Sequence, residues 1–252
     1  MRLKTISILI ICLNIIFCAS SQKKIEQARE KDPRYQCNLG LVYLNNGKVD
    51  LAIDYFNKSL SLLPNYDLAL NAIGIAYSMK GNFEESAKYY EKCLKINPSL
   101  TETHNYLGTV YQQMGFFDKA EEQFQQAAGN INYKSRELPY FNLARLYFLQ
   151  DKPKKALEFI EKSLALNNTL AMALNLKGLI NDKLENYEEA INCYNQALKI
   201  APDDLNLNFN LAVAYYKNSQ FKSARDIFEL ISAKTTDPEM KKKVEQFLNA
   251  LK

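Results

Sequence analysis

The sequence lacks tryptophan altogether and contains a single histidine, His104. One histidine cannot supply the histidine clusters that many zinc sites and acid–base catalysts use. No glycine-rich phosphate loop and no nucleophile elbow occurs in the 252 residues. The sequence therefore predicts no enzyme, no catalytic residue, no cofactor and no metal site, and His104 is expected to be an ordinary helix residue.

An excess of charge of one sign is missing as well. The chain has 32 Lys and Arg against 28 Asp and Glu, a net charge of +4, with no basic stripe. This balance argues against nucleic acid as a partner. The five cysteines lack the spacing of a metal or disulfide framework. Cys93 and Cys193 are expected to be inert packing thiols.

Glycine is scarce, yet seven of the eight glycines fall at two places of a repeat. The spacing is 34 residues, with one slip to 36. The first place holds small residues, namely Gly40, Gly74, Gly108, Ala144, Gly178 and Ala212. The second place holds Gly47, Gly81 and Gly115. Two further positions keep step, one mostly tyrosine from Tyr43 to Tyr215 and one mostly a ring from Phe56 to Phe228. Composition alone cannot produce this pattern.

Each repeat predicts a helix hairpin. In the first, Gly40 lacks a side chain where the second helix approaches, and Gly47 suits a turn. Ala52 and Phe56, four residues apart, form the facing stripe of the second helix. Pro64 then ends the hairpin. One such hairpin cannot bury its apolar face alone, so stacked repeats should share one core without an internal domain boundary.

The pattern resembles the tetratricopeptide-repeat (TPR) family, although the usual tryptophan is absent. The resemblance implies an all-α, right-handed TPR superhelical solenoid of six helix hairpins with a C-terminal capping helix. The expected repeats span residues 33–66, 67–100, 101–136, 137–170, 171–204 and 205–236. The capping helix spans residues 237–252, with Asp237 as N-cap, Pro238 in the first turn, and a buried stripe of Val244, Phe247, Leu248 and Leu251.

The N-terminus predicts export. Arg2 and Lys4 precede an apolar run from Ile6 to Phe17, which is short for a membrane span and suits a signal peptide over residues 1–18. Cys18 resembles the lipidated cysteine of bacterial lipoproteins, although Phe17 stands where that family has a small residue. Cleavage near Ser20 and an uncleaved anchor are the alternatives. Residues 19–32 are polar and are expected to be a tether. The expected location is the cell envelope, as an outer-membrane lipoprotein facing the periplasm.

The slip of two residues lies between the third and fourth repeats. There Gly129 to Tyr133 replaces the usual proline ending, and Arg136 follows. With the architecture, this loop resembles the pilotin lipoproteins of type IV pilus biogenesis. That resemblance implies help in targeting or assembling an outer-membrane secretin, whose subunit would be the protein partner. The alternative is a generic envelope TPR adaptor that docks proteases or cell-wall enzymes.

In TPR solenoids the first helices line the concave face, which binds partners. This rule predicts a groove formed by Leu41, Asn71, Ile75, Asn105, Phe141, Arg145, Phe148, Leu149, Asn175, Phe209 and Tyr216. The three asparagines share one repeat position and could hydrogen-bond an extended backbone. The alternative is that the apolar members pack within the fourth and sixth repeats. The family's clamp for chaperone tails is not expected, because Glu102 reverses the required charge.

The fifth repeat departs from the pattern. Lys177 and Asn181 occupy positions that are usually apolar. Two interpretations remain open: these residues loosen the solenoid, or they meet a partner.

Overall fold

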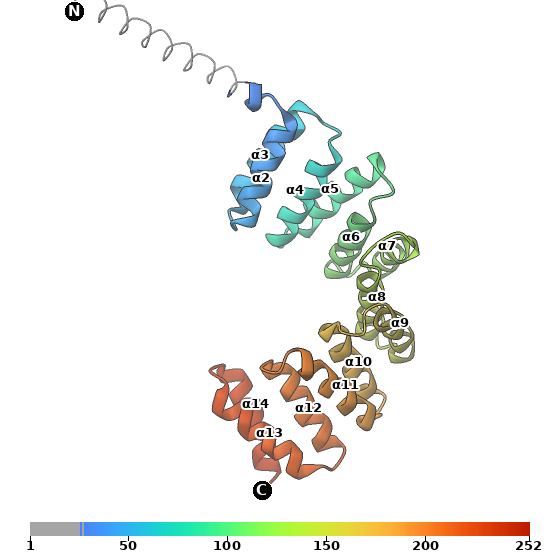
Figure 1. Ribbon diagram of the computed structural model, residues 1–252, viewed down its shortest axis with the longest axis vertical. Coiled ribbons are helices and arrows are strands. Elements are labelled where there is room, and N and C mark those ends of the chain that lie inside the picture. The colour runs from blue at the N-terminus through green and yellow to red at the C-terminus, as the bar shows by residue number, and fades with distance from the viewer. Residues whose placement is uncertain (1–25, 27) are drawn as a thin grey trace, which may run out of the picture. The chain divides into compact units, whose positions relative to one another are not determined.

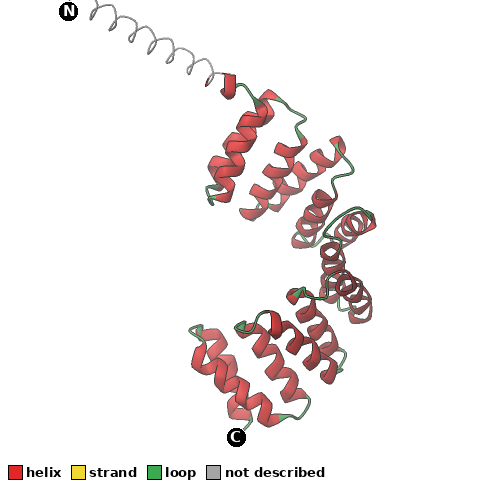
Figure 2. Cartoon of the chain, viewed as in Figure 1, coloured by secondary structure: helices red, strands yellow, loops and turns green. Residues whose placement is uncertain are grey.

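The computed structural model describes residue 26 and residues 28–252, and their regular secondary structure is entirely α-helical (Figures 1 and 2). The predicted signal peptide and Cys18 lie outside the described residues. The helices are α2 (Pro33–Asn45), α3 (Val49–Leu62), α4 (Asp67–Met79), α5 (Phe83–Ile96), α6 (Thr101–Gln113), α7 (Phe117–Gly129), α8 (Glu137–Leu149), α9 (Pro153–Leu166), α10 (Ala171–Lys183), α11 (Tyr187–Ile200), α12 (Leu205–Lys217), α13 (Phe221–Lys234) and α14 (Pro238–Ala250). Of these, none is long and apolar enough to cross a membrane.

Within each part of the chain that the contacts join, helices that follow one another in sequence pack side by side. Contacts pair α2 with α3, α4 with α5, α8 with α9, α10 with α11 and α12 with α13, and each pair also contacts the next helix along its unit. The second helix of one hairpin therefore packs on the first helix of the next, as in α3 and α4. This arrangement confirms the predicted all-α fold of stacked TPR hairpins.

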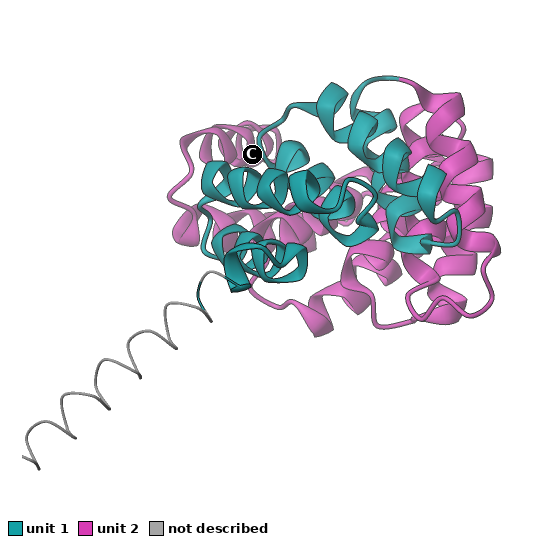
Figure 3. Cartoon of the chain, turned by 90° about the horizontal axis from the view of Figure 1, so that it is seen from above, with its two compact units in different colours: residues 1–115 teal, residues 116–252 magenta. Residues whose placement is uncertain are grey.

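The chain divides into two compact units between Gly115 and Phe116, in the turn that joins α6 to α7 (Figure 3). We call them unit 1, which contains α2 to α6, and unit 2, which contains α7 to α14. The expected absence of an internal domain boundary stays a prediction, because in a repeat fold each hairpin packs only on its neighbours and a division by contacts can fall at any junction.

Close packing between the two helices of a hairpin explains why the position of Gly40, Gly74 and Gly178 holds a small residue. A Cβ atom added to Gly74 would lie 2.5 Å from the Tyr90 ring, and one added to Gly178 would lie 2.4 Å from the Tyr194 ring. Both rings are almost completely buried. The predicted close approach of a ring to a missing side chain is confirmed.

The turn inside each hairpin requires a left-handed residue. Gly47, Gly81 and Gly115 have φ values of 71°, 73° and 79°. The later repeats place other residues at the same position, with φ of 59° at Asp151, 61° at Glu185 and 58° at Ser219. Because these residues carry a Cβ, their backbone is strained where glycine would not be.

The last helix, α14, closes the core of unit 2. The Asp237 side chain accepts a hydrogen bond of 2.9 Å from the backbone N–H of Glu239, and Pro238 begins the helix, as expected. Val244 is fully buried, and the Phe247 ring stacks on Phe228 with centroids 4.8 Å apart. The predicted capping helix thus covers the apolar face of α13.

Candidate protein-binding site

Helix α8 carries four of the predicted groove residues on one side. Phe141, Arg145 and Phe148 are half-buried, and Leu149 is 57% exposed. The opposite side of α8 buries Leu143, Ala144, Leu146 and Tyr147. Phe141 and Phe148 pack against the buried cluster that contains Ala144, Tyr147 and Ile160, as the alternative of packing within the fourth repeat expects, whereas Leu149 stays exposed. We call Phe141, Arg145, Phe148 and Leu149 the α8 face.

Two cations lie against the rings of the α8 face. The guanidinium carbon of Arg145 is 5.9 Å from the centroid of the Phe141 ring, and Lys183 Nζ is 5.8 Å from that of Phe148. Cations at this distance from a ring are attracted by its negative face. Because Lys183 pairs with Asp151 at 2.6 Å, Arg145 is the member that makes the apolar α8 face positively charged.

Arg145 is the unusual member of this face. Its Nε atom is buried without a hydrogen-bond partner, and no carboxylate of the described residues forms an ion pair with it. Burial lowers the pKa of the Arg145 guanidinium from its usual value, because desolvation disfavours the charged form. The side chain is nevertheless a cation at neutral pH.

The predicted asparagines join neighbouring first helices. Asn71 on α4 accepts a 2.9 Å hydrogen bond from Thr103 Oγ1 on α6, in unit 1. In unit 2, Asn175 on α10 accepts a 3.0 Å hydrogen bond from Asn210 Nδ2 on α12. Asn105 is buried. The side-chain oxygens of Asn71 and Asn175 therefore already accept hydrogen bonds within the fold. A partner that used these oxygens would share them with Thr103 and Asn210.

Phe209 and Tyr216 lie in the packed cluster beneath α14. The Phe209 ring contacts Phe228 and Phe247 with centroid distances of 5.8 and 5.9 Å. The Tyr216 ring lies 5.4 Å from that of Phe247. For these two residues the contacts favour the alternative that the apolar side chains pack within the sixth repeat.

Unit 1 places the remaining predicted residues beside its core. Leu41 and Ile75 are half-buried against the cluster that contains Cys37 and Phe56. Val42 and Met79, on the same two helices, are more exposed. The rule that selects groove residues by their position in the repeat did not select Val42. Such a rule does not consider how much of a side chain the neighbouring helix covers.

The loop after α7 exposes an apolar residue that sequence reasoning did not single out. Ile131 is 76% exposed, while Arg136 Nε donates a 3.4 Å hydrogen bond to the carbonyl of Ala128 and holds the loop to the end of α7. The sequence itself shows an isoleucine among polar residues in the loop that replaces the usual proline ending.

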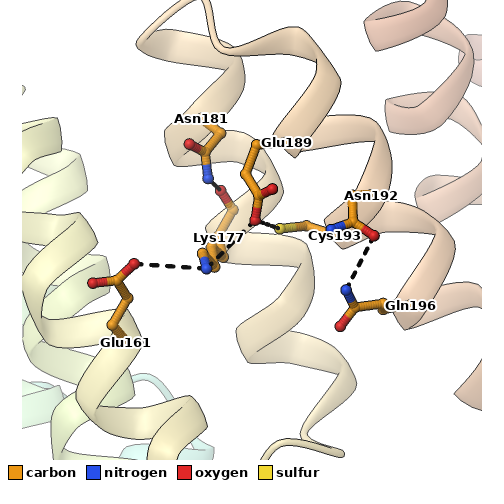
Figure 4. Close-up of polar contacts among 7 residues, drawn as sticks. All are labelled: Glu161, Lys177, Asn181, Glu189, Asn192, Cys193 and Gln196. Atoms are coloured by element: carbon orange, nitrogen blue, oxygen red, sulfur yellow. Dashed lines mark hydrogen bonds and ion pairs between the residues drawn. The ribbon is translucent and has the colours of Figure 1, made fainter.

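The polar residues of the fifth repeat bind one another and their neighbours (Figure 4). Lys177 Nζ on α10 lies 3.6 Å from Glu161 on α9 and 3.5 Å from Glu189 on α11. Asn181 donates a 2.9 Å hydrogen bond to the carbonyl of Lys177. Cys193 Sγ lies 3.7 Å from Glu189. These contacts give Lys177 and Asn181 partners inside the fold, so their polarity requires no external ligand.

Reactive chemistry is not favoured by the environments of the described cysteines and the histidine. Burial raises the pKa of the Cys37 and Cys93 thiols to about 11 and that of Cys193 to about 12, which suppresses the nucleophilic thiolate. His104 Nε2 lies 3.0 Å from the carbonyl of Pro98. Within the part of the chain that the structure describes, no group of three or more His, Cys, Asp or Glu side chains could hold a metal.

Comparisons of sequence agree with the repeat pattern. A family model described as "Tetratricopeptide repeat" matches residues 33–99, and one described as "Tetratricopeptide repeat protein 21 C-terminal ARM domain" matches residues 130–246. A TPR repeat-containing protein of Methanocaldococcus jannaschii is 29% identical over 98 residues, which are 39% of this chain. The match spans 17% of the length of that relative.

Solved structures share the fold over most of the chain. The structure of PilF from Pseudomonas aeruginosa has a TM-score of 0.76 at 18% identity, covering 87% of this chain and 99% of that one. PilW, described as a widely conserved type IV pilus biogenesis factor, has a TM-score of 0.79 at 13% identity, with 84% and 98% covered. YrrB, described as a TPR protein with an unusual peptide-binding site, has a TM-score of 0.58 at 16% identity, with 76% and 97% covered. At these identities the likeness is one of fold.

Proposed function

We propose that this chain, which is similar to tetratricopeptide-repeat proteins, assists the assembly or outer-membrane targeting of a type IV pilus secretin by binding a secretin subunit. The coarser role, a scaffold that binds protein, rests on the TPR fold itself. The observation that carries the binding role is the α8 face, where a well-exposed Leu149 adjoins two half-buried rings and a cation without a carboxylate.

Two features support the pilus assignment. The likeness to PilF and PilW extends over more than four-fifths of this chain and nearly all of theirs. The inserted loop before α8 is the part of the sequence that most resembles the pilotins, and it exposes Ile131.

The proposal includes a lipid anchor at Cys18, after a signal peptide, which places the protein at the inner surface of the outer membrane. Several acyl chains on one cysteine hold a protein firmly, whereas one chain gives only marginal binding. Cys18→Ser should move the protein from the membrane fraction to the soluble or unprocessed pool. The intact mass of the mature protein tests the anchor. A mass that corresponds to an unlipidated N-terminus at Ser20 or Ser21 contradicts it.

The binding role is tested by Leu149→Asp. If Leu149 is a binding hot spot, its loss should cost about 2 kcal/mol of binding, roughly 30-fold in affinity. The matched control is Leu166→Asp on α9, because Leu166 is 48% exposed in the same unit. Both variants are produced in a strain that lacks the native gene. Secretin multimers in the outer-membrane fraction and secretin subunits that co-purify with the protein are then measured.

We expect Leu149→Asp to lower both quantities and Leu166→Asp to leave both near wild type. Equal secretin in the deletion strain and the wild type contradicts the pilus role. If the protein then captures another envelope protein through Leu149, the generic adaptor is the better description. If neither variant alters any captured partner, the α8 face is not the binding site.

A further inference from the structure

Arg145 differs from Lys177 and Lys183, two other cations of unit 2, in having no carboxylate partner. Lys177 lies between Glu161 and Glu189, and the more exposed Lys183 pairs with Asp151 at 2.6 Å. Arg145 is half-buried like Lys177, yet no described carboxylate reaches it and its buried Nε has no hydrogen-bond partner.

An unpaired buried cation destabilises a folded protein, because the charge loses water without gaining a counter-charge. The Phe141 ring, 5.9 Å from the guanidinium carbon, offers only part of that compensation. The pKa of the guanidinium is lowered by this burial, yet an arginine stays charged at neutral pH and cannot relieve the cost by losing its proton. An anion from outside the chain would supply the counter-charge and the hydrogen-bond acceptor that Arg145 lacks.

We propose that the Arg145 guanidinium binds the side-chain carboxylate of an aspartate or glutamate within the partner segment that occupies the α8 face. This inference rests on the proposed binding role of that face. An internal acidic residue fits better than a chain end, because apolar side chains lie on both sides of Arg145. Phe141 lies one helical turn before it, and Phe148 and Leu149 lie one turn after it. The segment therefore continues in both directions from its carboxylate, with apolar residues as its flanks.

The shape of the arginine side chain predicts which group of the partner it binds. A guanidinium offers several N–H donors in a planar fork that matches a carboxylate, whereas a lysine ammonium is a compact point charge. The partner segment should therefore distinguish arginine from lysine at this position. It should also distinguish a carboxylate from an amide of the same shape.

The probe is a phage library of random linear dodecapeptides, displayed with residues on both sides of the random segment. It is selected on the full chain as wild type and as Arg145→Met, with Lys222→Met as the control. Lys222 is an exposed lysine on α13, and its replacement removes the same charge from the same unit. Peptides whose capture is lost with Leu149→Ser, which adds no carboxylate one turn from Arg145, are retained. Each is synthesised with its acidic residue and with the matching amide.

We expect peptides selected on wild type and on Lys222→Met to share an acidic residue flanked by apolar residues. Peptides selected on Arg145→Met should keep the apolar residues and lose the acidic preference. Replacing the acid by its amide should weaken binding to wild type by about 10- to 100-fold, the range for a hydrogen bond to a charged group. The same replacement should change binding to Arg145→Met by less than about twofold. Arg145→Lys should fall between the two.

Stability gives a second readout that a merely structural arginine would not produce. Because Arg145→Met removes an uncompensated charge and keeps an apolar stem, its melting temperature should equal or exceed that of wild type. A clear fall in melting temperature means that Arg145 supports the fold, and it overturns the inference.

The remaining outcomes separate the inference from the proposed binding role. Peptides that need Leu149 but bind acid and amide equally overturn the carboxylate site and leave the binding role standing. Peptides that bind only with a free C-terminus overturn the internal acidic residue. If no selected peptide depends on Leu149, the binding role fails and the carboxylate site fails with it.

Discussion

Glu185 shows how the later repeats depart from the earlier ones at a single backbone position. Its φ of 61° places a residue with a Cβ where Gly47, Gly81 and Gly115 stand in the first three repeats. A left-handed conformation costs such a residue roughly 1–2 kcal/mol, and glycine avoids that cost at some loss of chain entropy. The hairpin turns of unit 2 therefore store strain that the glycine turns of unit 1 do not.

The substitution Glu185→Gly should raise the free energy of unfolding by up to about 1 kcal/mol, because relief of the backbone outweighs the entropy of glycine. The Glu185 side chain makes no ion pair or hydrogen bond with the described residues, so little else is lost. Urea unfolding followed by circular dichroism measures the change. Gly81→Ala is the reverse control, and it should lower stability by about 1 kcal/mol, since a Cβ there meets only the backbone cost. A destabilised Glu185→Gly contradicts this account of the turn.

A second residue-scale prediction concerns Gly178 and the Tyr194 ring, which a Cβ atom would approach to 2.4 Å. Gly178→Ala should cost about 1–3 kcal/mol by overpacking. The fourth repeat carries Ala144 at this place and Ile160 in place of the ring, both fully buried. Tyr194→Ile should therefore restore room for the methyl group that Gly178→Ala adds, and the double variant should be more stable than the sum of the two single changes predicts. A double-mutant cycle in urea measures the coupling. Additive effects would show that the ring moves aside freely.

At the scale of the element, α14 is the helix whose role is most sharply defined by its contacts. Phe247 stacks on Phe228 at 4.8 Å and meets the Phe209 ring edge-on at 5.9 Å. Phe247→Ala should lower the free energy of unfolding by about 3 kcal/mol, because it opens a cavity among these rings. Gln246→Ala, an exposed neighbour on the same helix, should change stability by less than about 0.5 kcal/mol. Similar melting temperatures for Phe247→Ala and wild type would mean that α14 does not cap the core.

The helices and turns could be predicted from the sequence because each of the six repeats places similar residues at the positions of close packing and of the turn. The close approach at Gly74, the turn at Gly81 and the cap at Asp237 each follow from one residue and its local conformation. The left-handed turns at Asp151 and Glu185 were within reach too, since these residues stand in register with the glycines.

The candidate site was less accessible, because its character depends on contacts between helices far apart in sequence. Whether Lys177 is paired and Arg145 is not depends on carboxylates from neighbouring helices. Likewise Phe209 and Phe141 share a repeat-derived face, yet α14 covers Phe209 and not Phe141. Repeat positions cannot reveal this difference, because the capping helix breaks the symmetry between the repeats.

At the scale of the whole molecule, buried thiols in both units make stability depend on alkaline pH. Burial raises the pKa of Cys37 and Cys93 in unit 1 to about 11 and that of Cys193 in unit 2 to about 12, from an ordinary value of 9.0. In the unfolded chain these thiols lose their protons near pH 9, whereas in the folded chain they stay protonated. The folded state therefore binds more protons than the unfolded state in this window, and stability must fall as pH rises through it.

We expect the urea midpoint to fall between about pH 9 and pH 11, with each thiol contributing a slope of up to about 1.4 kcal/mol per pH unit. The triple variant Cys37→Ala, Cys93→Ala and Cys193→Ala should begin less stable at about pH 8, because each buried sulfur leaves a small void. Its midpoint should nevertheless fall less steeply between about pH 9 and pH 10 than that of wild type.

Buried tyrosines such as Tyr90 and Tyr194, whose pKa burial also raises, remain in both proteins. Their contribution begins only as the unfolded tyrosines titrate near about pH 10, so the interval below that pH isolates the thiols. Parallel pH profiles for the two proteins would show that the three thiols are hydrated in the folded chain, contrary to their burial in the packed hairpins.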